Sequence, residues 1–535
     1  MRIAALDLGS NSFHLLVVEA RLDGSFVPLA TEREMLRLGD LVALTGSIGE
    51  AARKRAVEVV RTFRAVADAQ RADEIVAVGT AALREAADGV ELVERIRAEA
   101  GIEVQVVDGV REAELIFTAI RSSVLIDPGP ALAADLGGGS LELMVGDRSG
   151  LSFAASLRLG VGRLTAELVR GDPPSRRERA ALSERVSREL SGVAGELVES
   201  KPRLLVGSSG TFAAIARMAS ALREGAVPAG VNQLSVTRSD VDALARRVRS
   251  STVAERSRMP GCDSRRAELL PAGIAVLEGL MDTTGLSELT VSEWALREGI
   301  VLDAIGAHDP AELLGDPRAL RRSSVLALCR RSSWRQRHAR KVADLAVELF
   351  DGTVELHGLG PDSRELLELG ALLHDIGEHV SRAGHDRHTA YLVENGGLRG
   401  FSPAEVAKLS VLGRYHVRGT PKASFESFAA LGAEDRAEVT ALVAILRLAD
   451  ALDSAHSSLV ERVGVVVQGG GGAPEGDRRR VELVIEAHGD GELELWNIRR
   501  KKELFERTFA CVVEERLVEL ARLAYDPDRG RSGPS

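Results

Sequence analysis

The beginning of the chain combines short apolar runs with a clear helical repeat. The apolar runs, which predict buried strands, lie at 3–6, 13–18, 74–78 and 103–107. Between them, the apolar residues from Val59 to Val66 recur at the spacing of an amphipathic helix. Strands that alternate with helices indicate an α/β domain, in which the strands lie inside and the helices cover them.

A similar region follows, and a different pattern takes over in the second half. The run 131–136, a glycine cluster and the run 141–145 open the second region, which ends in a helix near Leu302. Beyond a predicted linker at 310–317, helical periodicity dominates. Strand patterns return near the end, where two apolar runs flank the glycine-rich stretch 469–472, a predicted hairpin loop.

These patterns predict an α/β fold class, with two α/β domains followed by an all-α domain and a small α+β domain. The expected boundaries are 1–121 and 122–309 for the α/β domains, 318–458 for the all-α domain, 459–525 for the α+β domain and 526–535 for a disordered tail. A chain of 535 residues, 45% hydrophobic and 28% charged, is long enough and apolar enough to bury several such cores.

Charge and composition argue against several classes of protein. A net charge of −10 does not suit a protein that coats nucleic acid, although local basic clusters can still bind a polyanion. The N-terminus lacks the pattern of a signal peptide, and no apolar run approaches the roughly 20 residues of a membrane span. The 3 cysteines are far apart, which fits a reducing compartment. We therefore expect a cytoplasmic protein with no membrane or nucleic-acid partner.

An internal repeat is the strongest organisational feature. Residues 7–17 (DLGSNSFHLLV) align with residues 135–145 (DLGGGSLELMV), with Asp, Leu, Gly, Ser, Leu and Val at the same offsets. Each copy is a buried strand that ends in a carboxylate, a tight turn of small residues, and a second strand. Two such hairpins predict a duplicated domain with a cleft between the halves.

These turns have the chemistry of phosphate-binding loops. Glycine and serine leave backbone N–H groups uncovered, so such a turn can bend closely around a phosphate. The aspartate at each strand end would repel phosphate, and a hydrated Mg²⁺ between them resolves that conflict. A third small-residue loop, at 207–211, follows a strand and precedes a helix, which places helix N–H groups at an anion. One such loop is usually only a turn, whereas three in the same context predict a phosphate site.

Motifs in this half carry a family resemblance. In chain order they are DLGSNSF at 7–13, GTAALR at 79–84, EAELIF at 112–117, DLGGGSLE at 135–142 and GSSGT at 207–211. Together they resemble the exopolyphosphatase/guanosine pentaphosphate phosphatase family, from Met1 to about Leu302 and more weakly beyond. The resemblance implies two ribonuclease H-like domains of the actin-like ATPase superfamily. It also implies a Mg²⁺-dependent site between them that hydrolyses phosphoanhydrides.

The resemblance implies a role for each motif residue. Glu112 matches the catalytic glutamate that orients and activates the attacking water. Asp135 and Glu142 match the acidic residues that hold Mg²⁺ and help to place that water. Arg84 matches an arginine that contacts phosphate, and Asp7 could touch the metal or cap its own turn. The implied loop residues that bind substrate are Gly9, Ser10, Asn11, Ser12, Gly138, Gly139, Ser140, Gly207, Ser208, Ser209, Gly210 and Thr211.

Spaced histidine and aspartate residues mark the helical half. His338, His374, Asp375 and Asp450 fall on three expected helices. Buried imidazole and carboxylate groups are costly without partners, and a divalent transition metal would bind both. The set resembles the HD-type metal phosphohydrolase signature, which is often degraded in this family and is complete here. The candidates for a second metal or for substrate are His388 and His416.

Several functions fit this sequence. We expect a homodimeric exopolyphosphatase that releases orthophosphate from the ends of inorganic polyphosphate. Guanosine pentaphosphate 5′-phosphohydrolase is the near alternative, because the active-site motifs do not separate the two; basic clusters such as 499–502 favour polyphosphate. In a third hypothesis the HD-type domain is a nucleotide phosphohydrolase and the first half is its phosphate-binding sensor. In a fourth hypothesis, the HD-type domain serves only for dimerisation and for binding polyphosphate. An actin-like nucleotide-dependent regulator or sugar kinase is less well supported, because the sequence has no convincing adenosine-pocket pattern.

Overall fold

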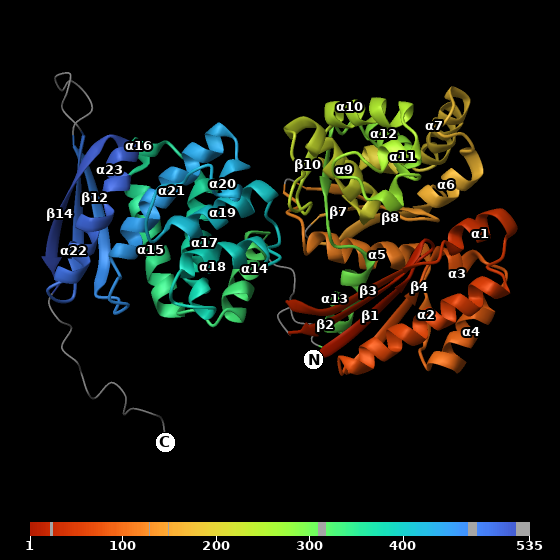
Figure 1. Ribbon diagram of the computed structural model, residues 1–535, viewed down its shortest axis with the longest axis horizontal. Helices are drawn as coiled ribbons and strands as arrows, with labels where there is room; N and C mark the ends of the chain where they lie inside the picture. Colours follow the sequence, from red (N-terminus) through yellow and green to blue (C-terminus); the bar gives the residue numbers. More distant parts are fainter. Residues whose placement is uncertain (22–24, 128, 148, 309–316, 469–478, 521–535) are drawn as a thin grey trace. The chain divides into compact units, whose positions relative to one another are not determined.

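The computed structural model describes residues 1–21, 25–127, 129–147, 149–308, 317–468 and 479–520. Most of the predicted linker, the glycine-rich loop and the predicted tail lie outside these residues. The chain forms two compact units, coloured red to green and green to blue in Figure 1. The N-terminal unit comprises Met1–Arg321 and Arg399–Pro403, and the C-terminal unit comprises Arg322–Leu398 and Ala404–Ser535.

The first sheet of the N-terminal unit has the strand order β3-β2-β1-β4-β5. Its strands are β1 (Arg2–Leu8), β2 (Ser12–Ala20), β3 (Phe26–Met35), β4 (Glu74–Gly79) and β5 (Val104–Val106). The helices of this half are α1 (Leu38–Thr45), α2 (Glu50–Ala69), α3 (Ala81–Glu85), α4 (Gly89–Ala100) and α5 (Gly109–Arg121). β1 pairs antiparallel with β2 and parallel with β4, so the chain needs a crossover before β4. α2 supplies it, and its apolar face, with Val60 and Phe63, shares a core with β1.

The second sheet repeats this arrangement, with the order β10-β11-β9-β6-β7-β8. Its strands are β6 (Ala131–Leu136), β7 (Leu141–Gly146), β8 (Leu151–Leu157), β9 (Leu204–Ser208), β10 (Ser235–Thr237) and β11 (Glu288–Val291). Its helices are α6 (Val161–Leu168), α7 (Arg176–Ser191), α8 (Ala194–Glu199), α9 (Ser209–Glu224), α10 (Arg238–Ser250), α11 (Val253–Arg256), η1 (Ser264–Arg266), α12 (Leu270–Thr284) and α13 (Leu296–His308). Read from its β8 edge, the second sheet has the order β8-β7-β6-β9-β11, which matches the order β3-β2-β1-β4-β5 of the first sheet strand by strand. β10 is an additional strand at the other edge. The predicted duplication into two ribonuclease H-like domains of the actin-like ATPase superfamily is thereby confirmed.

Two helices join the sheets of the N-terminal unit. α5 follows the first sheet in the chain but packs against β7 and β8, while α13 packs against β1, β2 and α5. Ile116 of α5 and Ile300 of α13 belong to one buried core with Ile3 of β1 and Ala133 of β6. This shared core fixes the two sheets relative to each other. The carboxyl ends of the duplicated strands β1 and β6 consequently line the same cleft.

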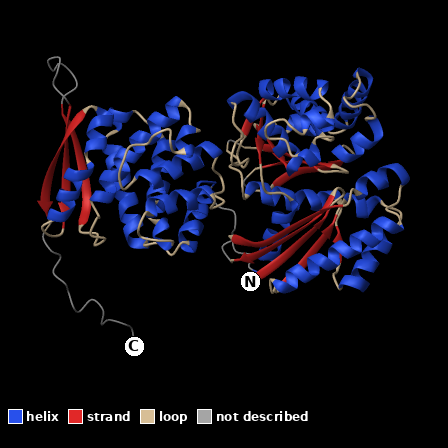
Figure 2. Cartoon of the chain, viewed as in Figure 1, coloured by secondary structure: helices blue, strands red, loops and turns tan. Residues whose placement is uncertain are grey.

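The C-terminal unit combines helices with a small sheet of order β12-β13-β14 (Figure 2). The helices of its first part are α14 (Pro317–Arg331, which starts in the N-terminal unit), α15 (Gln336–Gly352), α16 (Val354–His357), α17 (Pro361–Leu373), η2 (Ile376–His379), α18 (His385–Glu394), α19 (Pro403–Tyr415), α20 (Glu426–Ala429) and α21 (Ala433–Ala451). The last part contains β12 (Val460–Gln468), β13 (Arg479–Ala487), α22 (Glu492–Lys501), α23 (Glu503–Phe509) and β14 (Cys511–Glu519). A helical region followed by a small α+β region is the predicted order, whereas the exact domain boundaries and the HD-type assignment stay predictions.

Some elements differ from the sequence prediction. The helix predicted to end near Leu302 runs to His308, because Ala304 and Ile305 continue its apolar face into the shared core. Strands β3 and β8 were not predicted. Both are edge strands with half-exposed side chains, so they lack the apolar runs by which buried strands are recognised. Among the described residues, no helix has the length and apolar character needed to cross a membrane.

Candidate functional site

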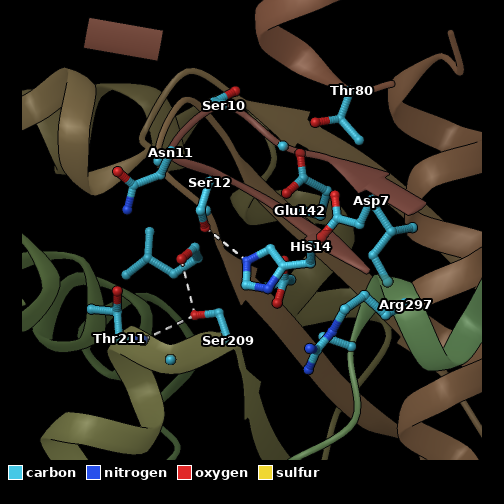
Figure 3. Close-up of a pocket in the computed structure, with 18 of the residues that line it drawn as sticks. Asp7, Ser10, Asn11, Ser12, His14, Thr80, Glu142, Ser209, Thr211 and Arg297 are labelled. Carbon is cyan, nitrogen blue, oxygen red and sulfur yellow. Dashed lines mark hydrogen bonds between the residues drawn. The ribbon is translucent and has the colours of Figure 1, made fainter. Parts of the chain in front are cut away.

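The turns of the two duplicated hairpins lie against each other in the N-terminal unit. A Cβ atom on Gly138 would lie 2.8 Å from the Cβ atom of Asn11, and one on Gly139 would lie 2.8 Å from Ser10 Oγ. Both distances are too short for a real side chain, so only glycine permits this approach. The approach places both turns on one cavity of about 430 Å³, which we call the cleft (Figure 3). Its volume is that of a small-ligand site.

Most of the predicted loop residues line the cleft. They are Gly9–Ser12, Gly138–Ser140 and Ser209–Thr211. Gly207 and Ser208 lie within β9 behind the cleft wall, and their predicted contact with phosphate is not supported by their position. Gly207 is packed under Phe212, and the Ser208 hydroxyl donates a hydrogen bond to the Asp135 carboxylate. Ser208 thus orients a predicted metal ligand.

The third loop has a strained backbone. Ser209 has a φ of 84°, a left-handed conformation that is costly for a residue with a side chain. Its hydroxyl donates to the carbonyl oxygen of Leu136 at 2.9 Å, which ties the third loop to the end of β6. A Cβ atom on Gly210 would lie only 2.2 Å from the Arg266 guanidinium. Gly210 therefore makes room for an arginine that lines the cleft.

Carboxylates lie on the strands that form the cleft, with Glu142 buried and Asp7 and Asp135 half-buried. Asp135 and Glu142 are cross-strand partners on β6 and β7, and Asp7 holds the equivalent place on β1. Burial raises the pKa of Asp7 to about 7 and that of Asp135 to about 6. Burial and the Asp135 carboxylate together raise the pKa of Glu142 to about 7, although the Ser156 hydroxyl donates to it at 2.9 Å. These carboxylates lack enough nearby positive charge to stabilise their ionised forms.

Glu112 enters the cleft from the first turn of α5. The Asp108 side chain caps this helix by accepting from the Arg111 backbone N–H at 2.8 Å, which fixes the turn that carries Glu112. Arg84 donates to Glu112 Oε2 at 3.2 Å and to the Val107 carbonyl oxygen at 2.6 Å. Burial and the Glu142 carboxylate raise the pKa of Glu112 well above its usual value, against the effect of Arg84.

Arg84 therefore holds the predicted base and is absent from the lining of the cleft, where it was predicted to contact phosphate. The guanidinium groups that line the cleft belong to Arg33 on β3, Arg266 on η1 and Arg297 on α13. Sequence reasoning missed all three. They lie on three separate elements, and no local motif marks any of them. Two atoms of Arg33, Nε and Nη2, are buried without a hydrogen-bond partner among the described residues, which suits binding of an anion.

His14 is a further cleft residue that sequence reasoning missed. It pairs with Asp7 in the register of β1 and β2, and its Nε2 atom lies 2.7 Å from Ser12 Oγ. Its Nδ1 atom is buried and has no partner among the described residues. Burial and the surrounding arginines lower the pKa of His14 well below its ordinary value, so the ring is neutral. The internal repeat held the signal, because it aligns His14 with Glu142. Figure 3 shows His14 beside Asp7 and Glu142 in the cleft.

A second group of chemically active side chains lies in the C-terminal unit. His338 comes from α15, His374 and Asp375 from the end of α17, and Asp450 from α21. The Nε2 atoms of His338 and His374 are 3.2 Å apart, and Asp450 Oδ1 is 3.8 Å from each. Two further histidines approach the opposite side of Asp375. We call the whole group the His–Asp cluster: His338, His374, Asp375, His385, His416 and Asp450.

The cluster corrects one expectation from the sequence. His388, the predicted candidate for a second metal, does not belong to the groups of potential ligands found among the described residues. His385, the first residue of α18, takes that place beside His416. His416 was predicted for this role. The four ligands predicted for the first metal are brought together, and the identity of any bound metal stays a prediction.

Comparisons with known proteins agree with this geometry. The Ppx/GppA phosphatase family matches residues 17–308, and the profile of Ppx/GppA phosphatase domain III matches residues 320–468. The chain is 35% identical to a Mycobacterium leprae protein named Exopolyphosphatase 1 over 303 residues, 56% of this chain and 89% of that protein. It is 33% identical over 303 residues to a Mycobacterium tuberculosis protein of the same name, covering 56% of this chain and 88% of that protein.

Solved structures resemble more than half of the chain. An exopolyphosphatase from Cytophaga hutchinsonii matches with a TM-score of 0.53 and 28% identity, over 59% of this chain and 100% of that chain. The Aquifex aeolicus member of the Ppx/GppA family matches with a TM-score of 0.50 and 27% identity, over 58% of this chain and 99% of that chain. The family resemblance of the five motifs is thereby confirmed. The chain belongs to the Ppx/GppA phosphatase family and is a phosphoanhydride hydrolase.

Proposed function

We propose that the chain is an exopolyphosphatase whose cleft removes terminal phosphates from inorganic polyphosphate. One observation carries the proposal: in the cleft, buried carboxylates and three arginines surround the two duplicated small-residue turns. The turns and arginines suit a chain of phosphates, and the carboxylates suit a cation and an attacking water. The names of the mycobacterial relatives support the same substrate.

The proposed reaction uses water and no covalent intermediate. A water oxygen attacks the terminal phosphorus in line with the bridging oxygen, Glu112 takes a proton from this water, and the P–O anhydride bond breaks. Orthophosphate and a polyphosphate one unit shorter leave as anions. Arg84 orients the Glu112 carboxylate, and the raised pKa of Glu112 makes it a stronger base than an exposed glutamate. Arg33, Arg266 and Arg297 would neutralise the phosphate charge.

Mg²⁺ fits the acidic side of this cleft. Asp7, Asp135 and Glu142 all have raised pKa values, and a cation would stabilise their ionised forms. Among the described residues, no three cleft carboxylates have ligand atoms that all lie within 4.8 Å of one another. Asp135 and Glu142 would therefore share Mg²⁺ with water and phosphate oxygens, as is usual for this ion. The ion would supply charge neutralisation at the cleaved phosphate.

The replacement Glu112→Gln tests the proposal. It should lower orthophosphate release from polyphosphate by about 10²–10⁴-fold and leave substrate binding nearly intact, because the amide cannot accept a proton. Glu114→Gln is the matched control, since Glu114 lies on the same helix and is exposed. The control should keep wild-type turnover. Near wild-type turnover in Glu112→Gln would reject the assignment.

Substrate preference requires a direct comparison. Values of kcat/KM for long polyphosphate, short polyphosphate and guanosine pentaphosphate, measured side by side, decide between polyphosphate and the nucleotide alternative. A higher kcat/KM for guanosine pentaphosphate would replace the proposed substrate and leave the chemistry of the cleft unchanged. The homodimer and the cytoplasmic location stay predictions, and analytical ultracentrifugation tests the first.

A further inference from the structure

The loop that joins β11 to α13, residues 292–295, forms part of the cleft wall. Its lining residues are Ser292, Glu293 and Ala295, and the first turn of α13 adds Leu296 and Arg297. Trp294 is absent from this lining. Its ring instead stacks on Phe26 of β3, with the ring centroids 4.9 Å apart. The position of Arg297 in the cleft therefore depends on the contacts that hold this loop from outside the cleft.

A short segment from much later in the sequence also contacts the Trp294 ring. Arg399–Pro403 connects α18 to α19, yet it belongs to the compact N-terminal unit. The Arg399 guanidinium carbon lies 5.2 Å from the centre of the Trp294 ring, which is within the range of a cation–π contact. Both side chains belong to half-buried residues, so water weakens this contact only in part.

The same segment binds the end of α5, the helix that carries Glu112 in its first turn. The last carbonyl groups of a helix lack partners within the helix. Gly400 N–H donates to the Ser123 carbonyl oxygen at 2.9 Å, and Arg399 Nη1 donates to the Ser122 carbonyl oxygen at 3.4 Å. A cation at this place also suits the negative end of the helix dipole. The segment thus joins the end of α5 to the loop before α13.

Ser123 connects these contacts to the loop. It is fully buried, and its carbonyl oxygen also accepts from Asn232 Nδ2 at 2.9 Å. Asn232 Oδ1 in turn accepts from the Glu293 N–H at 3.1 Å. Ser123 Oγ lies 2.9 Å from Ser292 Oγ, and the Ser292 hydroxyl donates to the Trp294 carbonyl oxygen at 2.7 Å. Two series of hydrogen bonds therefore link the end of α5 to the loop.

The segment around Arg399 has a defined conformation. Gly400 has a φ of 75°, in the left-handed region that glycine adopts at little cost. Phe401 is only 1% exposed, and the Arg321 guanidinium carbon lies 4.5 Å from the centre of its ring. Pro403 begins α19, where its fixed φ suits the first helical position. Arg399 is therefore presented to Trp294 by a segment that is itself anchored.

We propose that Arg399–Phe401 is a strap that positions Arg297 for binding phosphate, with Arg399 acting through Trp294. Arg399 is a positioning residue, because it is absent from the described residues that line the cleft. Loss of its side chain would release one contact of Trp294 and let the loop and the first turn of α13 shift. The effect on substrate rests on the proposed phosphate contact of Arg297, whereas the hold on the loop is measurable without substrate.

Amide hydrogen exchange of the full-length protein, without substrate, tests the hold on the loop. Arg399→Ala should speed exchange in residues 292–297 by about 10-fold, while β1 exchanges at the wild-type rate. Arg418→Ala is the matched control, since Arg418 is an exposed arginine of the C-terminal unit. It should leave exchange in 292–297 unchanged. Equal exchange in the two variants would overturn the strap, and so would exchange that is faster in β1 and the loop alike.

Steady-state hydrolysis of polyphosphate tests the effect on Arg297. Misplacing a binding group by about 1 Å can cost about 100-fold, and Phe26 still holds Trp294, so we expect Arg399→Ala to raise KM about 10-fold and to change kcat less than about 2-fold. Trp294→Ala should act similarly, and combining the two changes should raise KM no further, because both remove the same contact. Trp294→Phe keeps an aromatic ring and should stay near the wild-type KM.

The two measurements separate the strap from the proposed function. Faster exchange in the loop of Arg399→Ala, with a KM equal to that of Arg418→Ala, would overturn the positioning of Arg297. An equal loss of kcat in Arg399→Ala and in Trp294→Ala with an unchanged KM would do the same. A wild-type protein that does not hydrolyse polyphosphate would reject the proposed function, and the exchange rates would then still decide whether Arg399 holds the loop.

Discussion

Replacing Gly160 by alanine tests how closely the second phosphate-binding turn is held. Gly160 precedes α6, and the helix contacts the turn through backbone hydrogen bonds from Val161 to Gly137 and from Arg163 to Gly138. A Cβ atom on Gly160 would lie 2.3 Å from the Gly139 carbonyl carbon. The nearby atoms are all backbone, so no side chain can rotate away.

The size of the effect follows from this overlap. An ordinary contact begins at 3.4 Å, so the turn and the start of α6 must separate by about 1 Å. Overpacking of this kind costs about 1–3 kcal/mol. Misplacement of binding groups by about 1 Å can lower activity by about 10²-fold. We therefore expect Gly160→Ala to lower the Tm of the N-terminal unit by several degrees and kcat/KM for polyphosphate by about 10–100-fold.

Scanning calorimetry and phosphate release measure the two effects. Gly195→Ala is the matched control: Gly195 lies in α8, and a Cβ atom there would have no neighbour within 4 Å among the described residues. Its Tm should stay the same or rise slightly, because alanine is the better helix former. If Gly160→Ala leaves both Tm and kcat/KM unchanged, the turn is not held as tightly as described.

Four further predictions follow from the two sites. Without metal, protonation of Asp7 should make the fold on the order of 4 kcal/mol more stable below pH 4 than above pH 7, and this difference is lost as pH rises through its pKa of about 7; thermal melts should show a flatter pH profile for Asp7→Asn, and Mg²⁺ should restore stability at pH 7. Asp135→Asn and Glu142→Gln should each cost several kcal/mol of transition-state stabilisation and shift the Mg²⁺ titration of activity to higher concentration; unchanged curves would remove their metal role. Arg297→Met should raise KM for polyphosphate and reduce the slope of log affinity against log salt by about 1, whereas an equal slope would place Arg297 outside the phosphate contact. Asp453→Ala should weaken metal binding by the C-terminal unit about 10–100-fold in a competition titration, because it frees His338.

Local pattern predicted the duplicated hairpins and the residues that they carry. β6 spans Ala131–Leu136, as the apolar run indicated, and β7 begins at the predicted Leu141. The repeat of strand, turn and strand placed Asp135 at the cleft, and the family resemblance added Glu142, which is its cross-strand partner. The glycines were predictable for the same reason, since a turn between two buried strands needs small residues. All of this information lies within a few residues along the chain.

The remaining site residues depend on contacts that the sequence pattern does not contain. Arg33, Arg266 and Arg297 reach the cleft from three separate elements, and only tertiary packing brings them together. The choice between His385 and His388 shows a different limit. Residues three apart share a helix face, so both fit the helical period equally well. α18 begins at His385 because Gly384 adopts a left-handed conformation with φ 74°, and that start directs His385 toward Asp375.

The two sites differ in donor chemistry, which determines how each holds its cation. On the acidic side of the cleft, the carboxylate oxygens are too far apart to fill the coordination sphere of one ion. A hard ion such as Mg²⁺ therefore needs phosphate oxygens as further ligands. Substrate and cation should therefore bind the cleft together and leave together. The His–Asp cluster supplies four imidazole nitrogens on fixed rings in addition to Asp375 and Asp450. Nitrogen donors favour transition metals and need no substrate atom to complete the site. Brief dialysis should accordingly remove Mg²⁺ from the cleft while the cluster keeps its metal, and loss of both at the same rate would contradict this difference.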